Sequence, residues 1–113
     1  MNWLITVPQT RINDFLTEIE MAKHEPLIKR FKVPPNMKEP RFGDALYIVY
    51  DGAVRGMMPI RDNEVLATPF KCTATACHWD AARYLVCEIS KYTEITDGAK
   101  TTGFQGLRRY RNQ

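Results

Sequence analysis

The chain has 113 residues, of which 44% are hydrophobic and 26% charged, with a formal net charge of +3. This length suits one domain with one core, so we expect a single domain over residues 1–113. The composition excludes a disordered tail, and no apolar run approaches the length of a membrane-spanning helix. Residues 1–7 lack the features of a signal peptide, which favours a cytoplasmic protein with no membrane partner.

The odd number of cysteines fits a reducing compartment, where thiols pack as small hydrophobes. The group Cys72, Cys77 and His78 lacks a fourth ligand at zinc-site spacing, and adjacent ligands are difficult to direct at one ion. The sequence identifies no general base that would activate Cys77 as a nucleophile. We therefore expect no metal, no cofactor and no catalytic residue.

Residues 2–7 predict a first strand that ends at Pro8. Thr10 is expected to cap a helix that runs through Ala22 and ends before Pro26, with Asp14 in its favourable first turn. The helix is predicted from apolar residues at helical spacing: Ile12, Phe15, Leu16 and Ile19. It should place one apolar stripe on the barrel.

Residues 26–42 are expected to be irregular, because four prolines alternate with cations across this segment. Two interpretations stay open for it: a solvated, proline-stiffened loop, or an electrostatic contact surface for phosphates. Its apolar residues predict partial docking with one helical turn. These residues are Leu27, Ile28, Phe31 and Val33.

The stretch 43–56 is the clearest hairpin, with a strand over 45–50 and the turn pair Asp51 and Gly52. Both alternating faces of that strand are apolar, which predicts a central strand covered on both sides, as in a closed barrel wall. Residues 57–60 should end the return strand, and Arg61 to Glu64 should form a polar turn.

Beyond that turn, residues 65–76 alternate like a half-buried strand, with Pro69 favouring an edge position. Residues 77–80 interrupt the pattern, and 82–89 form another strong strand. The tail from Gly103 to Arg111 is expected to close a barrel.

Three stretches carry a family resemblance: Trp3 to Thr6, the Gly-Asp-led strand from Phe42 to Val49, and Gly103 to Tyr110. In this order they resemble the PUA-like superfold, and within it the ASCH and EVE groups. The resemblance implies an α+β protein, a small mixed β-barrel of about five to six strands with one main N-terminal helix. It also implies a cleft that binds RNA, or a modified base in DNA or RNA.

Two departures limit the resemblance. The basic segment from Lys29 to Arg41 replaces the stretch that helps form the EVE base pocket. The Gly-x-Lys motif of ASCH enzymes, which act on acylated cytidines with a lysine, a threonine and a glutamate, is not found near the N-terminus. We therefore favour a binding module over an enzyme.

The C-terminal arginines and Tyr110 have the chemistry of a phosphate clamp with base stacking, although a solvated terminal strand is the simpler interpretation. Strand alternation would place Arg109 and Arg111 on one face and Arg108 and Tyr110 on the other. Trp79, in a polar interruption, is the best stacking candidate. Further residues are expected to line a cleft or reach it: Thr6, Gln9, Glu88 and Arg55.

These features favour a small nucleic-acid-binding module whose phosphate contacts come from the terminal arginines and from Lys29, Arg30, Lys32 and Arg41. RNA or single-stranded nucleic acid is preferred over duplex DNA, because the predicted helix exposes acidic residues. One alternative is a nucleoside amidohydrolase or ribonuclease of ASCH type, with Glu88 beside a basic partner. Another is a protein-interaction factor of a mobile genetic element, with an apolar patch around Leu27, Phe31 and Val33.

Overall fold

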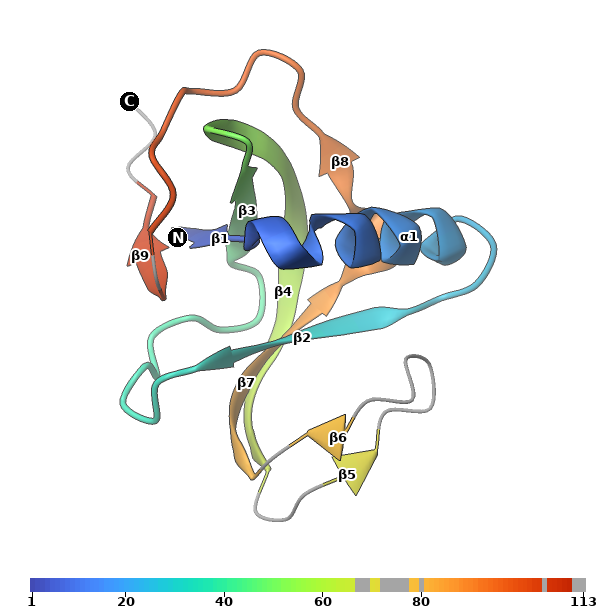
Figure 1. The fold of residues 1–113 in the computed structure, drawn as a ribbon. Coiled ribbons are helices and arrows are strands. Elements are labelled where there is room, and N and C mark those ends of the chain that lie inside the picture. The colour runs from blue at the N-terminus through green and yellow to red at the C-terminus, as the bar shows by residue number, and fades with distance from the viewer. Residues whose placement is uncertain (67–69, 72–77, 80, 105, 111–113) are drawn as a thin grey trace.

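The structure is a computed structural model that describes residues 1–66, 70–71, 78–79, 81–104 and 106–110. It is an α+β protein in which one helix packs on a mixed sheet (Figure 1). The strands are β1 (Asn2–Thr6), β2 (Ile28–Val33), β3 (Ala45–Tyr50), β4 (Ala53–Leu66), β5 (Phe70–Lys71), β6 (His78–Trp79), β7 (Ala82–Glu88), β8 (Thr93–Glu94) and β9 (Leu107–Arg109). The helix is α1 (Ile12–Ala22), and the 3-10 turns are η1 (Gln9–Arg11) and η2 (Ile89–Lys91).

The main sheet runs in the order β2-β7-β4-β3-β1-β9, and β8 pairs with β4 outside this path. The pair of β1 and β3 is parallel, and the other described pairs are antiparallel. The path is open, with β2 at one end and β9 at the other, so the predicted closed barrel is not confirmed. The β5 and β6 strands form a separate two-stranded ribbon that projects from the main sheet (Figure 1).

The hairpin of β3 and β4 is confirmed. Asp51 and Gly52 have φ angles of 50° and 75°, which is the left-handed geometry that a two-residue hairpin turn requires. Leu46 and Ile48 are completely buried on the core face of β3. On the opposite face Val49 is buried and Tyr47 is half-buried, so β3 is covered on both sides at its turn end only.

The long strand β4 joins the two parts of the sheet. Its first half pairs with β3 and its second half with β7, across a register shift between Ile60 and Asp62. The polar turn predicted at Arg61 to Glu64 is therefore wrong. The irregularity lets the strand bend and continue, while the polar side chains stay exposed or half-buried (Figure 1).

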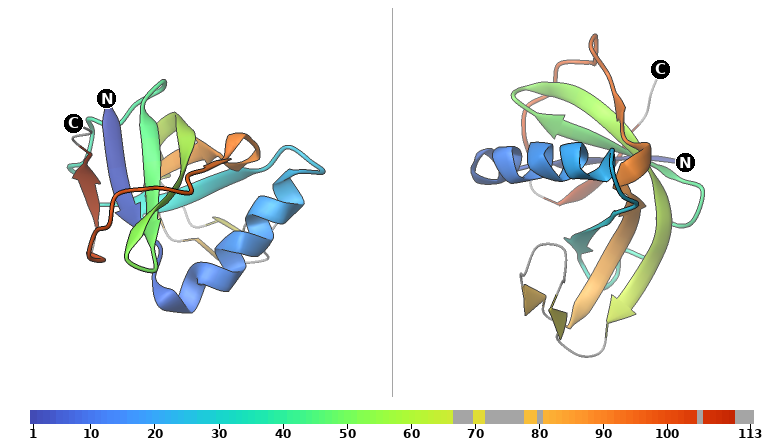
Figure 2. Two further views of the ribbon diagram at one scale, coloured as in Figure 1. Left: turned by 90° about the horizontal axis from the view of Figure 1, so that it is seen from above. Right: turned by 90° about the vertical axis from the view of Figure 1, so that its right-hand side faces the viewer.

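The helix begins later than predicted. Thr10 lies inside η1, where the Arg11 N–H donates to the Pro8 carbonyl at 2.8 Å, and the residue that precedes α1 makes no capping hydrogen bond through its side chain. The Thr10 cap is therefore wrong. Asp14 does lie in the first turn. The apolar stripe is confirmed at Ile12 and Phe15, which are buried, and at Ile19, which packs against the core, but Leu16 is 40% exposed and lies outside the stripe. Figure 2 shows α1 lying across the concave side of the sheet.

The basic segment contains a strand that the sequence did not predict. Residues Ile28–Val33 pair with β7, and the prolines flank this strand instead of interrupting it. Val33 is buried, and Leu27 and Phe31 pack against the core. The helical turn predicted here is wrong. Val33 cannot contribute to the apolar patch expected of a protein-interaction factor, because it is buried, and Leu27 and Phe31 are half-buried.

Asp44 anchors the start of β3. Its carboxylate accepts hydrogen bonds from the Trp3 indole N–H at 3.0 Å, the N-terminal ammonium at 3.1 Å and the Arg41 N–H at 3.3 Å. Burial alone would raise the pKa of Asp44, but these donors outweigh burial and hold the pKa below its ordinary value. Asp44 therefore satisfies the backbone N–H of Arg41, as is common for an aspartate at a turn. Trp3 is therefore a core residue, not part of an open cleft.

Within the described residues, α1 is too short and too polar to cross a membrane, and the same holds for every other helical segment.

Candidate functional site

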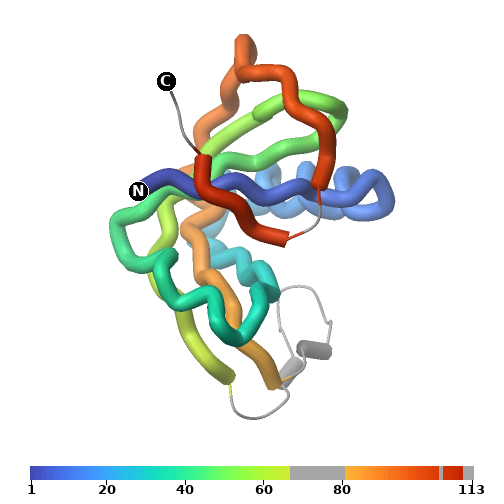
Figure 3. The backbone as a smooth tube through the Cα atoms, turned by 90° about the vertical axis from the view of Figure 1, so that its left-hand side faces the viewer, coloured from blue at the N-terminus to red at the C-terminus, as the bar shows by residue number. Residues whose placement is uncertain are grey.

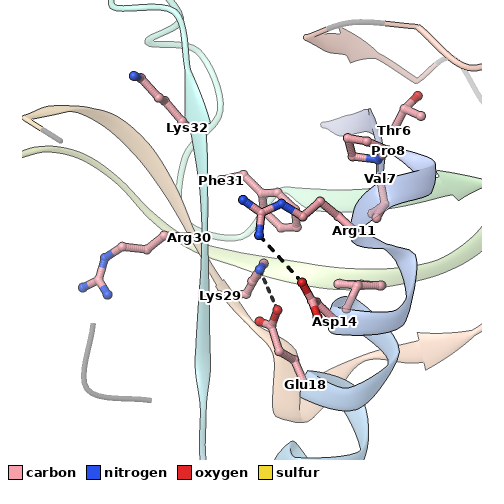
Figure 4. A pocket seen from close by; sticks show the side chains of 11 residues that line it. Thr6, Val7, Pro8, Arg11, Asp14, Glu18, Lys29, Arg30, Phe31 and Lys32 are labelled. Carbon is pink, nitrogen blue, oxygen red and sulfur yellow. Dashed lines mark hydrogen bonds and ion pairs between the residues drawn. The ribbon is translucent and has the colours of Figure 1, made fainter. Parts of the chain in front are cut away.

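A cavity of about 360 Å³ lies between the end of β1, the first half of α1 and strand β2 (Figure 4). Its volume is within the range of small-molecule pockets, roughly 300–1,000 Å³. The buried part of its lining is apolar and comes from Val7 and Phe15, with Phe31 half-buried. The remaining lining residues are Thr6, Pro8, Arg11, Asp14, Glu18, Lys29, Arg30 and Lys32.

Four of the residues that the sequence singled out line this pocket: Thr6, Lys29, Arg30 and Lys32. Lys29 is not a free cation. Its ammonium lies 2.8 Å from the Glu18 carboxylate of α1, and the two side chains are only 20% and 17% exposed. This half-buried pair joins β2 to α1 across the pocket, so Lys29 is largely neutralised before any ligand binds.

The other two cations of β2 differ from Lys29. The Arg30 Nε lies 2.8 Å from the Glu64 carboxylate of β4, so Arg30 is paired as well. Lys32 is exposed and forms no ion pair with a described residue. In Figure 4 its side chain points away from α1. Lys32 is therefore an exposed cation at the rim of the pocket and does not point into its interior.

Arg11 is a pocket residue that the sequence did not single out. It precedes α1, reaches toward β2 (Figure 4) and lies 3.7 Å from Asp14 in a highly exposed pair. An exposed pair of this kind contributes little, so the guanidinium can exchange Asp14 for a phosphate at small cost. The sequence feature that could have identified Arg11 as a site residue is its position directly before the predicted helix.

Strand β9 carries the predicted C-terminal cluster and pairs with β1 (Figure 3), and none of its residues lines the pocket. Arg109 forms an ion pair with Glu39 at 2.5 Å and lies over the Trp3 ring. Arg108 lies 4.4 Å from the centroid of the Phe104 ring. The predicted alternation is confirmed for residues 108–110, and Arg111 lies outside the described residues.

Other predicted residues do not join the pocket. Arg55 donates to the carbonyls of Tyr50 and Asp51 at the hairpin turn. Arg41 lines a different hollow of about 330 Å³ beside Asp44. Gln9 is exposed in η1, and Glu88 forms a local surface pair with Lys91 at 2.9 Å.

Several predictions concern residues that the structure does not describe. The side chains of Trp79 and His78, and all of Cys72, Cys77, Pro69 and Arg111, lie outside the described part of the chain. Among the described residues, no group of three or more His, Cys, Asp or Glu side chains could hold a metal ion. Cys87 is buried, and burial raises its pKa to about 12, so it is not a nucleophile at neutral pH.

Comparison with known proteins does not place the chain in a family. A scan against protein-family models finds no match, and neither curated proteins nor solved structures give a significant similarity.

Proposed function

We propose that the protein is a PUA-like domain of ASCH or EVE type that binds RNA or another single-stranded nucleic acid, with an unpaired or modified base in the pocket between β1, α1 and β2. The observation that carries the proposal is the composition of this pocket. An apolar interior with Phe31 suits a base, while Arg11 and Lys32 are exposed cations that suit phosphates.

The order of the elements supports the proposal. A first strand leads into the main helix, and a Gly-Asp-led hairpin follows the basic segment. The sheet is mixed, with β1 parallel to β3, and the C-terminal segment returns to pair with β1. This arrangement agrees with the mixed sheet and N-terminal helix that the resemblance implies.

The ion pairs reduce the number of cations that are available for phosphate contacts. Glu18, Glu64 and Glu39 already hold three of the predicted cations. Phosphate contacts at the pocket are therefore assigned to Arg11 and Lys32. The acidic residues Asp14 and Glu18 leave the pocket only mildly positive, which favours a single strand over the denser charge of a duplex.

The test is binding of the purified protein to labelled single-stranded RNA, single-stranded DNA and duplex DNA over a salt series. Replacing Arg11 and Lys32 by glutamine should weaken binding and flatten the dependence of log K on log salt by roughly 0.7 for each lost contact with a single strand. Arg61→Gln is the matched control, because Arg61 is exposed on β4 and does not line the pocket. If the wild-type protein binds none of the three at low salt, the proposal is wrong.

The pocket also favours a second candidate, a nucleoside amidohydrolase of ASCH type. That activity needs a lysine and a carboxylate together in the cleft, and Lys29 and Glu18 meet this condition with Thr6 in the same lining. Hydrolysis would add water to the acyl carbon and break its bond to nitrogen, releasing a carboxylic acid and the free base amine. Incubation with an N4-acylated cytidine should release acid from the wild-type protein and not from Lys29→Met. No turnover by the wild-type protein would exclude this substrate.

A further inference from the structure

We propose that the outer face of β1, β3 and β9, opposite the core, is a stacking platform for single-stranded nucleic acid that continues from the pocket. This inference rests on the proposed function and extends it from one base in a pocket to a short strand along a surface.

The residues of the platform follow from the strand register. Trp3, Ile5, Leu46 and Leu107 point into the core and are buried. Alternation places their neighbours on the opposite face. Leu4 pairs with both Tyr47 and Arg108, and Tyr47 pairs with Met57 of β4, so these four side chains form a row across the sheet.

The aromatic side chains of this face are pre-assembled. The Tyr47 and Tyr110 rings pack edge to face, with their centroids 4.7 Å apart, and both residues are half-buried. Arg108 is exposed, and its guanidinium lies over the Phe104 ring. Rings that are already held in place lose little conformational freedom when a base stacks on them, and each such base contributes measurably to affinity.

Charge favours a nucleic acid as the occupant. The outer-facing described positions of β1, β3 and β9 include Arg108 and no acidic residue. This differs from the pocket, where Asp14 and Glu18 offset the cations. A row of aromatic and apolar side chains with one exposed guanidinium matches a base-stacking surface with a phosphate contact.

The platform and the pocket meet at Thr6. The Thr6 side chain lines the pocket, and its hydroxyl accepts a hydrogen bond from the Phe104 N–H at 3.2 Å. Phe104 in turn supports Arg108. A strand whose base enters the pocket can therefore pass Thr6 and place its next nucleotides over Phe104, Arg108 and the tyrosine pair.

The experiment measures binding of a labelled 12-nucleotide single-stranded RNA by wild-type protein and by Tyr110→Leu, Tyr110→Phe and Tyr47→Leu variants. Loss of a stacking ring should weaken binding by about 5- to 100-fold in the leucine variants, whereas Tyr110→Phe should bind like the wild type. Circular dichroism checks that each variant folds. Tyr110 follows the last residue of β9, so Tyr110→Leu keeps the test valid if Tyr47→Leu does not fold.

Crosslinking shows whether the aromatic residues contact RNA directly, which residues with a purely structural role would not do. Ultraviolet irradiation of the wild-type complex should attach RNA to peptides that contain Tyr110, Tyr47 or Phe104. If the Arg11 and Lys32 variant loses affinity while folded Tyr110→Leu binds like the wild type, the platform is refuted and the pocket stands. If the wild-type protein binds no nucleic acid at low salt, both proposals fail together.

Discussion

Replacement of Asp44 by alanine is expected to destabilise the protein more than a typical surface change. The Asp44 side chain is buried and accepts hydrogen bonds from the Trp3 indole and the Arg41 backbone, besides its contact with the N-terminal ammonium. The substitution removes the acceptor but leaves the Trp3 N–H in the core, where water cannot replace the lost partner.

The magnitude follows from these contacts. A hydrogen bond to a buried charged group contributes about 1.5–3 kcal/mol, and the longer Arg41 contact adds about 0.5–1 kcal/mol. The free energy of unfolding should therefore fall by about 2–4 kcal/mol in Asp44→Ala. Asp44→Asn keeps one acceptor oxygen for Trp3 and Arg41, but it loses the charge and the second oxygen, which accepts from the N-terminal ammonium. Its cost should therefore be about half as large.

Urea denaturation followed by tryptophan fluorescence measures both values, and repeating it at different pH values tests the charge. The folded-state pKa of Asp44 is lowered, so its contribution to stability is present above the unfolded pKa of about 3.9 and is lost as pH falls through the folded pKa. The stability difference between wild type and Asp44→Asn should therefore be constant near neutral pH and shrink below about pH 4.

Two results would refute this reasoning. The first is a free energy of unfolding for Asp44→Ala within about 0.5 kcal/mol of the wild type, which is the range of ordinary surface substitutions. The second is a Trp3→Phe variant in which Asp44→Ala costs as much as it does in the wild type, because the two residues share a buried hydrogen bond and should be strongly coupled.

Two further predictions concern the core. A side chain at Gly56 would occupy the space of the Tyr92 ring, which packs edge to face on Phe15, so Gly56→Ala should cost about 1–3 kcal/mol in thermal unfolding. Adding Tyr92→Leu should recover part of that loss, and an unchanged melting temperature in Gly56→Ala would contradict the packing. Cys87 should resist alkylation at pH 8 in the native state and react in urea, as peptide mapping can show, because burial raises its pKa to about 12. Labelling of native Cys87 at the rate of a free thiol would disprove its burial.

The elements specified by local chemistry were predicted well. Asp51 and Gly52 dictate their turn through a backbone geometry that few other residue pairs adopt, and Phe15 repeats at helical spacing with its apolar neighbours. The strands in polar sequence were missed. Strand β2 is rich in cations and lies at the end of the sheet, and the second half of β4 passes through Asp62 and Asn63. Their identity as strands depends on pairing with β7.

The sequence identified some residues of the candidate site, but it did not show which of their side chains are already paired. Lys29 and Arg109 appeared in the sequence as available cations, yet Glu18 and Glu39 reach them from other elements. Such partners depend on the fold and leave no local pattern. Arg11 and Tyr47 were overlooked because neither belongs to a charged cluster: Arg11 is the last residue of a 3-10 turn, and Tyr47 lies within an apolar strand.

The position of β9 has a consequence for the order of events during synthesis. Strand β1 is made first, but its two partners come much later, β3 from the middle of the chain and β9 from residues 107–109. The hairpin of β3 and β4 can form locally, whereas pairing of β1 with β9 requires closure of nearly the whole chain. One edge of β1 therefore stays unpaired until residues 107–109 have been synthesised and can reach it. Amide hydrogens that bond β1 to β9 should be the last in the main sheet to gain protection and the first to exchange.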